Sequence, residues 1–380
     1  MGSRRNILGA VSLAACVSAL PATAQDATPQ EKAPIKLGAI LSTTGGLASL
    51  GLAERDGVLL GVKTVNARGG IAGHPLELLL EDDGSNPDAA MSKINTLAHA
   101  KGVVAVIGPS GIAQTVAIGA ITQREELPVL AFTGLGPAVE AKRDCVLHLT
   151  PAQELNARAL LSYARDNGGK RLGVLHDSGY GQVVWGAMEK LGAEYGVDFV
   201  AVEKLELSAT DATPQAAKVK AAEPDMVIVL SSNATGFRNL RQVGLTQPIV
   251  SVHGTALYDV VRAMGDPADN VVHAEFLIAE DPQPYQTDFV TAFQAEYGRL
   301  PKHLEAAGWD AVMATAAALE KTGPEPEQGA LCKALRAPWP GAFAAYDFSA
   351  PDMGGLTLAS FNYSLLTKGQ FSRLPYRAAQ

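Results

Sequence analysis

The chain has 380 residues, of which 47% are hydrophobic and 18% charged, and its formal net charge is -8. This length exceeds what one compact core usually holds, and the composition is that of a packed globular protein, so two lobes are expected. The acidic balance argues against nucleic acid and anionic membrane surfaces as partners.

The first segment of the chain has the pattern of an export signal. Arg4 and Arg5 precede an apolar stretch from Ile7 to Leu20, and Ala22–Ala24 provides small residues for cleavage. Residues 1–24 are therefore predicted to be a signal peptide, and the mature protein is expected in the periplasm. Two alternatives stay open, because the arginine pair also fits a twin-arginine signal and the residues around Cys16 also fit a lipid-anchor box.

Short apolar runs alternate with helical patterns through the rest of the chain. The predicted strands are Ile35–Leu41, Leu76–Leu80, Val103–Ile107, Val129–Phe132, Leu172–His176, Phe199–Val202, Met226–Leu230, Ile249–Val252 and Ser360–Thr367, with an extended stretch at Val271–Ile278. The predicted helices are one around Val58–Val65, then Pro87–Ala100, Ile112–Glu125, Glu154–Asp166, Gln182–Tyr195, Thr213–Ala222, Gly236–Val243, Leu257–Met264, Tyr285–Tyr297 and His303–Lys321. Strands separated by helices indicate right-handed βαβ units, so the fold class is α/β with two doubly wound parallel-sheet lobes.

Other classes of protein receive little support from the motifs. The histidines are scattered, and no nucleophile elbow, zinc-protease helix or dinucleotide loop occurs, so no enzyme, metal or cofactor is expected. Cys145 and Cys332 are far apart and match no zinc spacing. Two separate buried thiols are the favoured interpretation, and a single disulfide is the alternative.

An ordered set of motifs gives the chain a family resemblance. The motifs are IKLGAILSTTGGLASLG (35–51), NARGGIAG (66–73), EDDGSNPDAA (81–90), VIGPSG (106–111), HDSGYG (176–181) and NLRQ (239–242). Together they resemble the leucine/isoleucine/valine-type periplasmic binding proteins from Ile35 to the C-terminus. The resemblance implies the type I periplasmic binding protein fold, in which two lobes, joined by a three-segment hinge, close on a ligand. It implies one lobe of residues 35–149 plus 277–345 and another of 151–274 plus 346–375, with crossings near Thr150, Glu275 and Tyr346.

Two loops of the first lobe are candidate ligand contacts. Ser110 and Gly111 lie between a buried strand and a helix, where free backbone N–H groups and the serine hydroxyl favour a carboxylate, although a plain helix cap is the alternative. By the resemblance, the next loop holds the polar head of the ligand with the backbone of Thr133, Gly134, Leu135 and Gly136.

The second lobe contributes the facing edge of the expected cleft. Tyr180 follows a predicted strand and, by the resemblance, closes over the ligand, while Ser232 and Asn233 line the same edge. His253 stands where the amino-acid binders of this family carry a glutamate that pairs with the ligand's ammonium group.

The histidine at position 253 changes the ligand that the sequence favours. A neutral or positive imidazole cannot offset an ammonium charge, but it can donate a hydrogen bond to a carboxylate or keto group. We therefore expect a carboxylic acid without an ammonium, such as an aromatic or 2-keto acid, unless Asp177 or Glu275 pairs with an ammonium instead. The expected role is the solute-binding component of an ABC importer, a monomer that delivers its ligand to an inner-membrane permease. The alternatives are a binding protein for branched-chain or other amino acids and a ligand-sensing receptor module.

Overall fold

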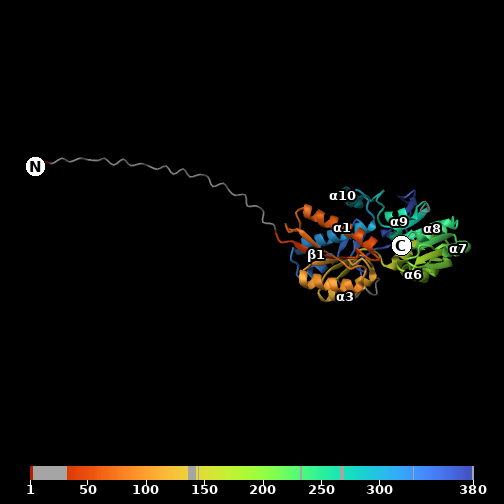
Figure 1. Ribbon diagram of the computed structural model, residues 1–380, viewed down its shortest axis with the longest axis horizontal. Helices are drawn as coiled ribbons and strands as arrows, with labels where there is room; N and C mark the ends of the chain where they lie inside the picture. The colour runs from red at the N-terminus through yellow and green to blue at the C-terminus, as the bar shows by residue number, and fades with distance from the viewer. Residues whose placement is uncertain are drawn as a thin grey trace.

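The computed structural model describes residues 1–2, 32–135, 143, 145–231, 233–265, 269–327 and 329–378. The predicted signal peptide lies outside these residues, apart from its first two. Figure 1 shows two α/β lobes side by side, with β1, α1 and α3 in one and α6, α7 and α8 in the other. No helix of the described residues is long and apolar enough to cross a membrane.

Lobe 1 is built on a five-stranded parallel sheet with the strand order β2-β1-β3-β4-β5. The side chains of β1, an interior strand of this sheet, alternate between two apolar layers, because Leu37 and Ala39 join one core cluster and Ile40 joins another. The bounds are β1 (Ile35–Leu41), α1 (Ala48–Ala67), β2 (Leu76–Asp82), α2 (Pro87–Asn95) with a π-helical turn (Thr96–Lys101), β3 (Ala105–Ile107), α3 (Ile112–Arg124), β4 (Val129–Ala131) and β5 (Val146–His148).

Lobe 2 is built on a seven-stranded mixed sheet with the order β14-β13-β10-β9-β8-β6-β7. Five of these strands are parallel, β13 pairs antiparallel with β10, and β14 pairs antiparallel with β13 at the edge of the sheet. The bounds are α5 (Gln153–Asp166), β6 (Arg171–Asp177), α6 (Tyr180–Tyr195), β7 (Asp198–Leu205), α7 (Thr213–Ala221), β8 (Met226–Leu230), α8 (Thr235–Gln242), β9 (Ile249–Val252), a 3-10 turn (His253–Thr255), α9 (Tyr258–Met264), β10 (Val271–Glu275), β13 (Asn362–Thr367) and β14 (Gln370–Arg373).

The segment after β10 returns to lobe 1. It holds α10 (Thr287–Tyr297), α11 (His303–Thr322), α12 (Ala330–Leu335) and a hairpin of β11 (Pro338–Pro340) and β12 (Ala345–Asp347). Glycines bring α11 into backbone contact with α1: a Cβ on Gly57 would lie 1.9 Å from the carbonyl oxygen of Glu305, and one on Gly308 would lie 2.3 Å from that of Glu54. Neither position therefore tolerates a side chain without moving a helix.

Hydrogen bonds tie the segments that pass between the sheets. Tyr346 donates from its hydroxyl to the carbonyl of Leu149 at 3.2 Å, and Asn362 donates from its amide to the carbonyl of Phe276 at 2.8 Å. The chain passes from the five-stranded to the seven-stranded sheet after β5, returns after β10 and passes over again after β12.

The preference for two separate thiols is wrong, because Cys145 and Cys332 form a disulfide with their Cα atoms 5.6 Å apart. Cys145 precedes the edge strand β5, and α12 carries Cys332 to that edge by packing beside α11. The sequence analysis also missed β5, α12 and the β11–β12 hairpin, all of which are short.

Candidate ligand-binding cleft

The loop after β3 presents Ser110 at the start of α3. Ser110 is buried, its Oγ accepts a hydrogen bond from the backbone N–H of Ser42 at 3.0 Å, and a second hydrogen bond joins it to Oε2 of Glu54. Gly111 is the N-cap residue of α3, with extended backbone and no side-chain cap. The first turn of α3 therefore keeps backbone donors that an anion can use.

Two buried carboxyl groups lie behind Ser110. Glu54 is 1% exposed, and its burial, opposed by the hydrogen bond with Ser110 and reinforced by the charge of Asp83, raises its pKa to about 8. Ser42 donates from Oγ to Oδ1 of Asp83 at 2.7 Å, and the other oxygen of Asp83 is buried without a hydrogen-bond partner. Among the residues that the structure describes, neither carboxyl forms an ion pair with lysine or arginine.

The loop after β4 packs against the first crossing. The carbonyl of Thr133 accepts a hydrogen bond from the ring of His148, and a Cβ on Gly134 would lie 2.6 Å from the backbone nitrogen of Ala152. The glycine at 134 is thus required by contact with the crossing segment. Gly136, like Ser232 in lobe 2, lies outside the described residues.

A cavity of about 740 Å³ opens beside this loop, between Leu135 of lobe 1, the crossing residues 152–154 and the first turns of α6. Its volume suits a small organic ligand. Of the predicted contacts that the structure describes, only Leu135 lines it, and Gly134 lines a smaller cavity of about 190 Å³ against Thr150.

Polar side chains from both lobes meet near the end of β9. The rings of Tyr180, the first residue of α6, and His253 form an edge contact with 6.4 Å between their centres, and the ring of His303 of α11 forms another with His253 at 4.8 Å. The hydroxyl of Tyr180 and the Nδ1 atoms of His253 and His303 are all buried without a hydrogen-bond partner. Buried polar atoms without partners are uncommon because each costs free energy, so this group points to a place where ligand atoms complete the bonding.

The histidines in this group are neutral at physiological pH. Burial, with a further contribution from the charge of Lys302, lowers the pKa of His253 to about 3, and burial also holds the pKa of His303 well below its ordinary value. Each ring therefore offers one donor and one acceptor and no charge. The sequence analysis missed His303, because only the packing of α11 against lobe 2 brings it to His253.

The acids that were alternatives for an ammonium partner are engaged within the protein. Oδ1 of Asp177 accepts hydrogen bonds from the backbone N–H groups of Gly179 and Gly181, at 2.9 and 2.8 Å. Glu275 pairs with Lys302 at 2.7 Å and accepts a hydrogen bond from Ser364.

The side chain of Asn233 is also used locally. Its Oδ1 accepts from the backbone N–H of Thr235 at 3.0 Å, and its Nδ2 donates to the carbonyl of Leu207 at 3.1 Å. These bonds fix the start of α8. The amide of Asn233, which the sequence analysis placed at the edge of the cleft, is therefore already hydrogen-bonded within the protein.

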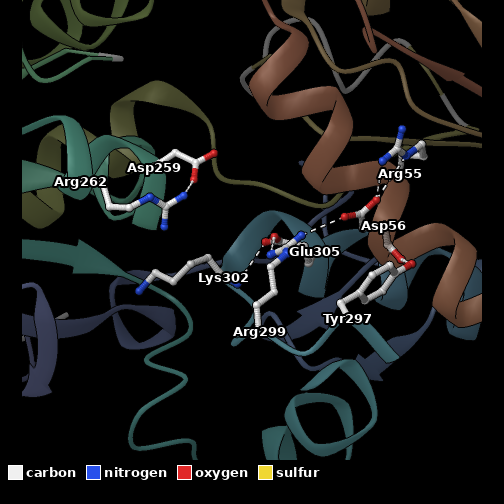
Figure 2. Close-up of polar contacts among 8 residues, drawn as sticks. All are labelled: Arg55, Asp56, Asp259, Arg262, Tyr297, Arg299, Lys302 and Glu305. Atoms are coloured by element: carbon white, nitrogen blue, oxygen red, sulfur yellow. Dashed lines mark hydrogen bonds and ion pairs between the residues drawn. The ribbon is translucent and has the colours of Figure 1, made fainter. Parts of the chain in front are cut away.

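Charged residues link α1 to the segment before α11, as Figure 2 shows. Arg299 bonds to Asp56 at 2.8 Å and to Glu305 at 2.7 Å, and Asp259 and Arg262 of α9 pair with each other opposite this network. The network links α1 to the first turn of α11, the helix that begins with His303.

Two doubly wound lobes, joined by three crossings and bringing unpaired polar atoms together between them, define a two-lobed binding protein. A family model described as periplasmic binding protein matches residues 34–357, so the chain belongs to that family. The predicted family and fold class are thereby confirmed, and the chain is a solute-binding protein rather than an enzyme.

In sequence the chain is similar to proteins named as Leu/Ile/Val-binding protein homologues. Leu/Ile/Val-binding protein homolog 7 of Brucella melitensis is 24% identical over 310 residues, which cover 76% of each chain. Leu/Ile/Val-binding protein homolog 8 of Brucella abortus is 25% identical over 297 residues, covering 71% of this chain and 72% of its own.

Solved structures share the fold. The branched-chain amino acid transporter substrate binding protein LivJ of Streptococcus pneumoniae, in complex with isoleucine, has a TM-score of 0.79 at 22% identity, covering 90% of this chain and 100% of its own. The leucine binding protein LivK of Thermotoga maritima has a TM-score of 0.76 at 20% identity, covering 90% and 97%.

Proposed function

We propose that this protein is the extracytoplasmic solute-binding component of an ABC importer, and that it captures one small α-carboxylate solute between its lobes. The observation that carries the proposal is the meeting of buried, unpartnered polar atoms of Tyr180, His253 and His303 from both lobes. A ligand that bridges these atoms favours the closed arrangement of the lobes over an open one.

The carboxylate of the solute would lie at Ser110 and the first turn of α3. Backbone N–H groups at a helix start carry partial positive charge, and the 13-residue length of α3 gives that end a full macrodipole. The neutral imidazoles would then contact the remaining polar group of the solute.

Amino acids are the first ligand class to consider. The names of the Brucella relatives and the isoleucine in the LivJ complex support them over the aromatic and keto acids that His253 favoured in the sequence. A keto or aromatic acid is the second candidate, because His253 is neutral and because Asp177 and Glu275 are both engaged elsewhere. An ammonium group would then have no evident carboxylate partner beside the histidines.

The cellular role follows the family. We propose export through the leader of residues 1–24, action as a monomer in the periplasm, and transfer of the solute to an inner-membrane permease. A lipid anchor at Cys16 is the alternative to release from the membrane.

A matched pair of solutes separates the two ligand classes. L-leucine and its 2-keto acid share a carboxylate and a carbon skeleton. They differ because leucine carries an ammonium group at the carbon where the keto acid carries a keto group. Thermal-shift titration followed by calorimetry would report which of them stabilises the protein, since a ligand at about 100 times its Kd adds about 2.7 kcal/mol. Stabilisation by leucine alone supports the first class and by the keto acid alone the second. No response to any standard amino acid, keto acid or aromatic acid would refute carboxylate capture.

A further inference from the structure

Ser110 donates a hydrogen bond from Oγ to Oε2 of Glu54, and protonation of that carboxyl would allow the direction of this bond to reverse. A serine hydroxyl has one hydrogen to donate and two lone pairs to accept with. The backbone N–H of Ser42 already donates to Oγ, and Oε2 of Glu54 lies at the second position. The hydrogen of Ser110 therefore goes to Glu54 when that carboxyl is ionised, and is released when Glu54 carries a proton and donates it to Oγ.

The surroundings of Glu54 favour the protonated carboxyl. The side chain is buried, and the charge that acts on its pKa is that of Asp83, a like charge. On its own helix, Arg55 pairs with Asp56 rather than with Glu54, and Figure 2 shows Asp56 also bonded to Arg299. The same burial raises the pKa of Glu54 to about 8.

The helices packed against α1 bring no basic partner to Glu54 within the described residues. On α11, Glu305 is bonded to Arg299, and Asp310 accepts from the backbone N–H groups of Ala342 and Phe343. Lys302, just before α11, is committed to Glu275. On α10, Tyr297 donates to the backbone carbonyl of Asp56, and Glu296 pairs with Lys63.

We propose that Glu54 is a positioning residue that couples ligand capture to a proton: protonated Glu54 donates to Oγ of Ser110 and frees the serine hydrogen for the carboxylate of the ligand. Ionised Glu54 accepts that hydrogen instead, and its negative charge then lies behind Ser110, where the carboxylate of the ligand would bind. The inference rests on the proposed capture of a carboxylate at Ser110 and adds the residue that controls it. No bond is made or broken except the O–H bond of Glu54, whose proton exchanges with solvent.

This arrangement fixes the sign of the pH dependence. Because the carboxylate binds the form with protonated Glu54, binding takes up a proton, and the affinity falls as the pH rises through the pKa of Glu54 in the free protein. With a pKa near 8, the Kd should rise about tenfold between pH 7 and pH 9. If an ammonium group paired with ionised Glu54, the affinity would rise over the same range.

The test uses the full mature protein, with whichever of L-leucine and its 2-keto acid binds more tightly as the probe. Glu54→Gln keeps a donor for Ser110 at every pH, and Asp56→Asn on the same helix is the control. Calorimetry from pH 7 to pH 9, in two buffers of different ionisation enthalpy, should show proton uptake and an approximately tenfold loss of affinity for the wild type and for Asp56→Asn. Glu54→Gln should show neither. A flat wild-type profile, a rising affinity, or the same pH dependence in Glu54→Gln would overturn the proposal.

A ligand-free measurement keeps this result separate from the proposed function. The infrared difference between the wild type and Glu54→Gln at pH 6.5 should contain the carbonyl band of a protonated carboxylic acid, and its absence overturns the role of Glu54. Failure of both probes to bind, with that band present, counts against carboxylate capture and not against the protonation of Glu54.

Discussion

The ion pair between Lys302 and Glu275 stands where the chain returns from lobe 2 to lobe 1, and its removal should be costly. Nζ of Lys302 lies 2.7 Å from Oε2 of Glu275 and 3.7 Å from the centre of the Phe371 ring, and the two charged side chains are 2% and 0% exposed. Lys302→Met keeps most of the side-chain volume and leaves Glu275 buried without a counter-charge. Breaking a buried pair in this way costs about 3–5 kcal/mol of unfolding free energy.

The double variant Lys302→Met/Glu275→Gln separates the cost of an unpaired charge from the value of the pair. With both charges gone, its stability should return to within about 2 kcal/mol of the wild type, because the desolvation cost of both ions disappears with their attraction. Urea unfolding, followed by circular dichroism, would give the unfolding free energies of the wild type, the two single variants and the double variant, which together form a double-mutant cycle. The single variant should also recover stability at low pH, where Glu275 becomes protonated. A loss below about 1 kcal/mol for Lys302→Met, or additive losses in the double variant, would refute this reasoning.

Four further outcomes are expected. Ser110→Ala should weaken ligand binding by about 1.5–3 kcal/mol through loss of a charge-assisted hydrogen bond, and unchanged affinity in calorimetry would place the carboxylate elsewhere. Because burial raises the pKa of Glu54 to about 8, its contribution to stability is complete below pH 4.5 and lost as the pH rises through 8. Glu54→Gln should therefore gain stability relative to the wild type by about 1–3 kcal/mol between pH 6 and pH 9, and the same difference at both pH values in urea unfolding would contradict this. Cys145→Ser should lose about 2–5 kcal/mol by freeing a closed loop of the unfolded chain, and an unchanged denaturation midpoint would count against that role. Saturation with ligand should reduce the radius of gyration in small-angle scattering as the lobes close, and an unchanged radius would exclude hinge closure.

The elements that sequence could predict are those with strong apolar patterns. Strands β1, β8 and β9 begin and end at the predicted residues, because continuous apolar runs between turn residues are typical of strands buried on both faces. The three-residue strand β5 and the short helix α12 carry too few residues to show a period. The pairing of Cys145 with Cys332 depends on those two elements and was missed with them.

The residues of the candidate site likewise fall into those that the sequence could predict and those that it could not. Ser110, Tyr180 and His253 follow strands at the carboxyl edge of their sheets, so their position could be read from the pattern of strands and loops. The roles of Glu54 and His303 could not, because each depends on helix packing: α1 brings Glu54 against Ser110, and α11 brings His303 across from the other lobe. The neutrality of His253 is likewise a result of its burial between Tyr180, His303 and the hinge, which its place in the sequence does not reveal.

A crystal structure of the protein with its bound solute tests the central claim most directly. The account predicts one small molecule between the lobes, with its carboxylate at Ser110 and the first turn of α3, and with its other polar atoms bonded to Tyr180, His253 and His303. A ligand without a carboxylate, or one that binds elsewhere and leaves Ser110 and both histidines uncontacted, would contradict it.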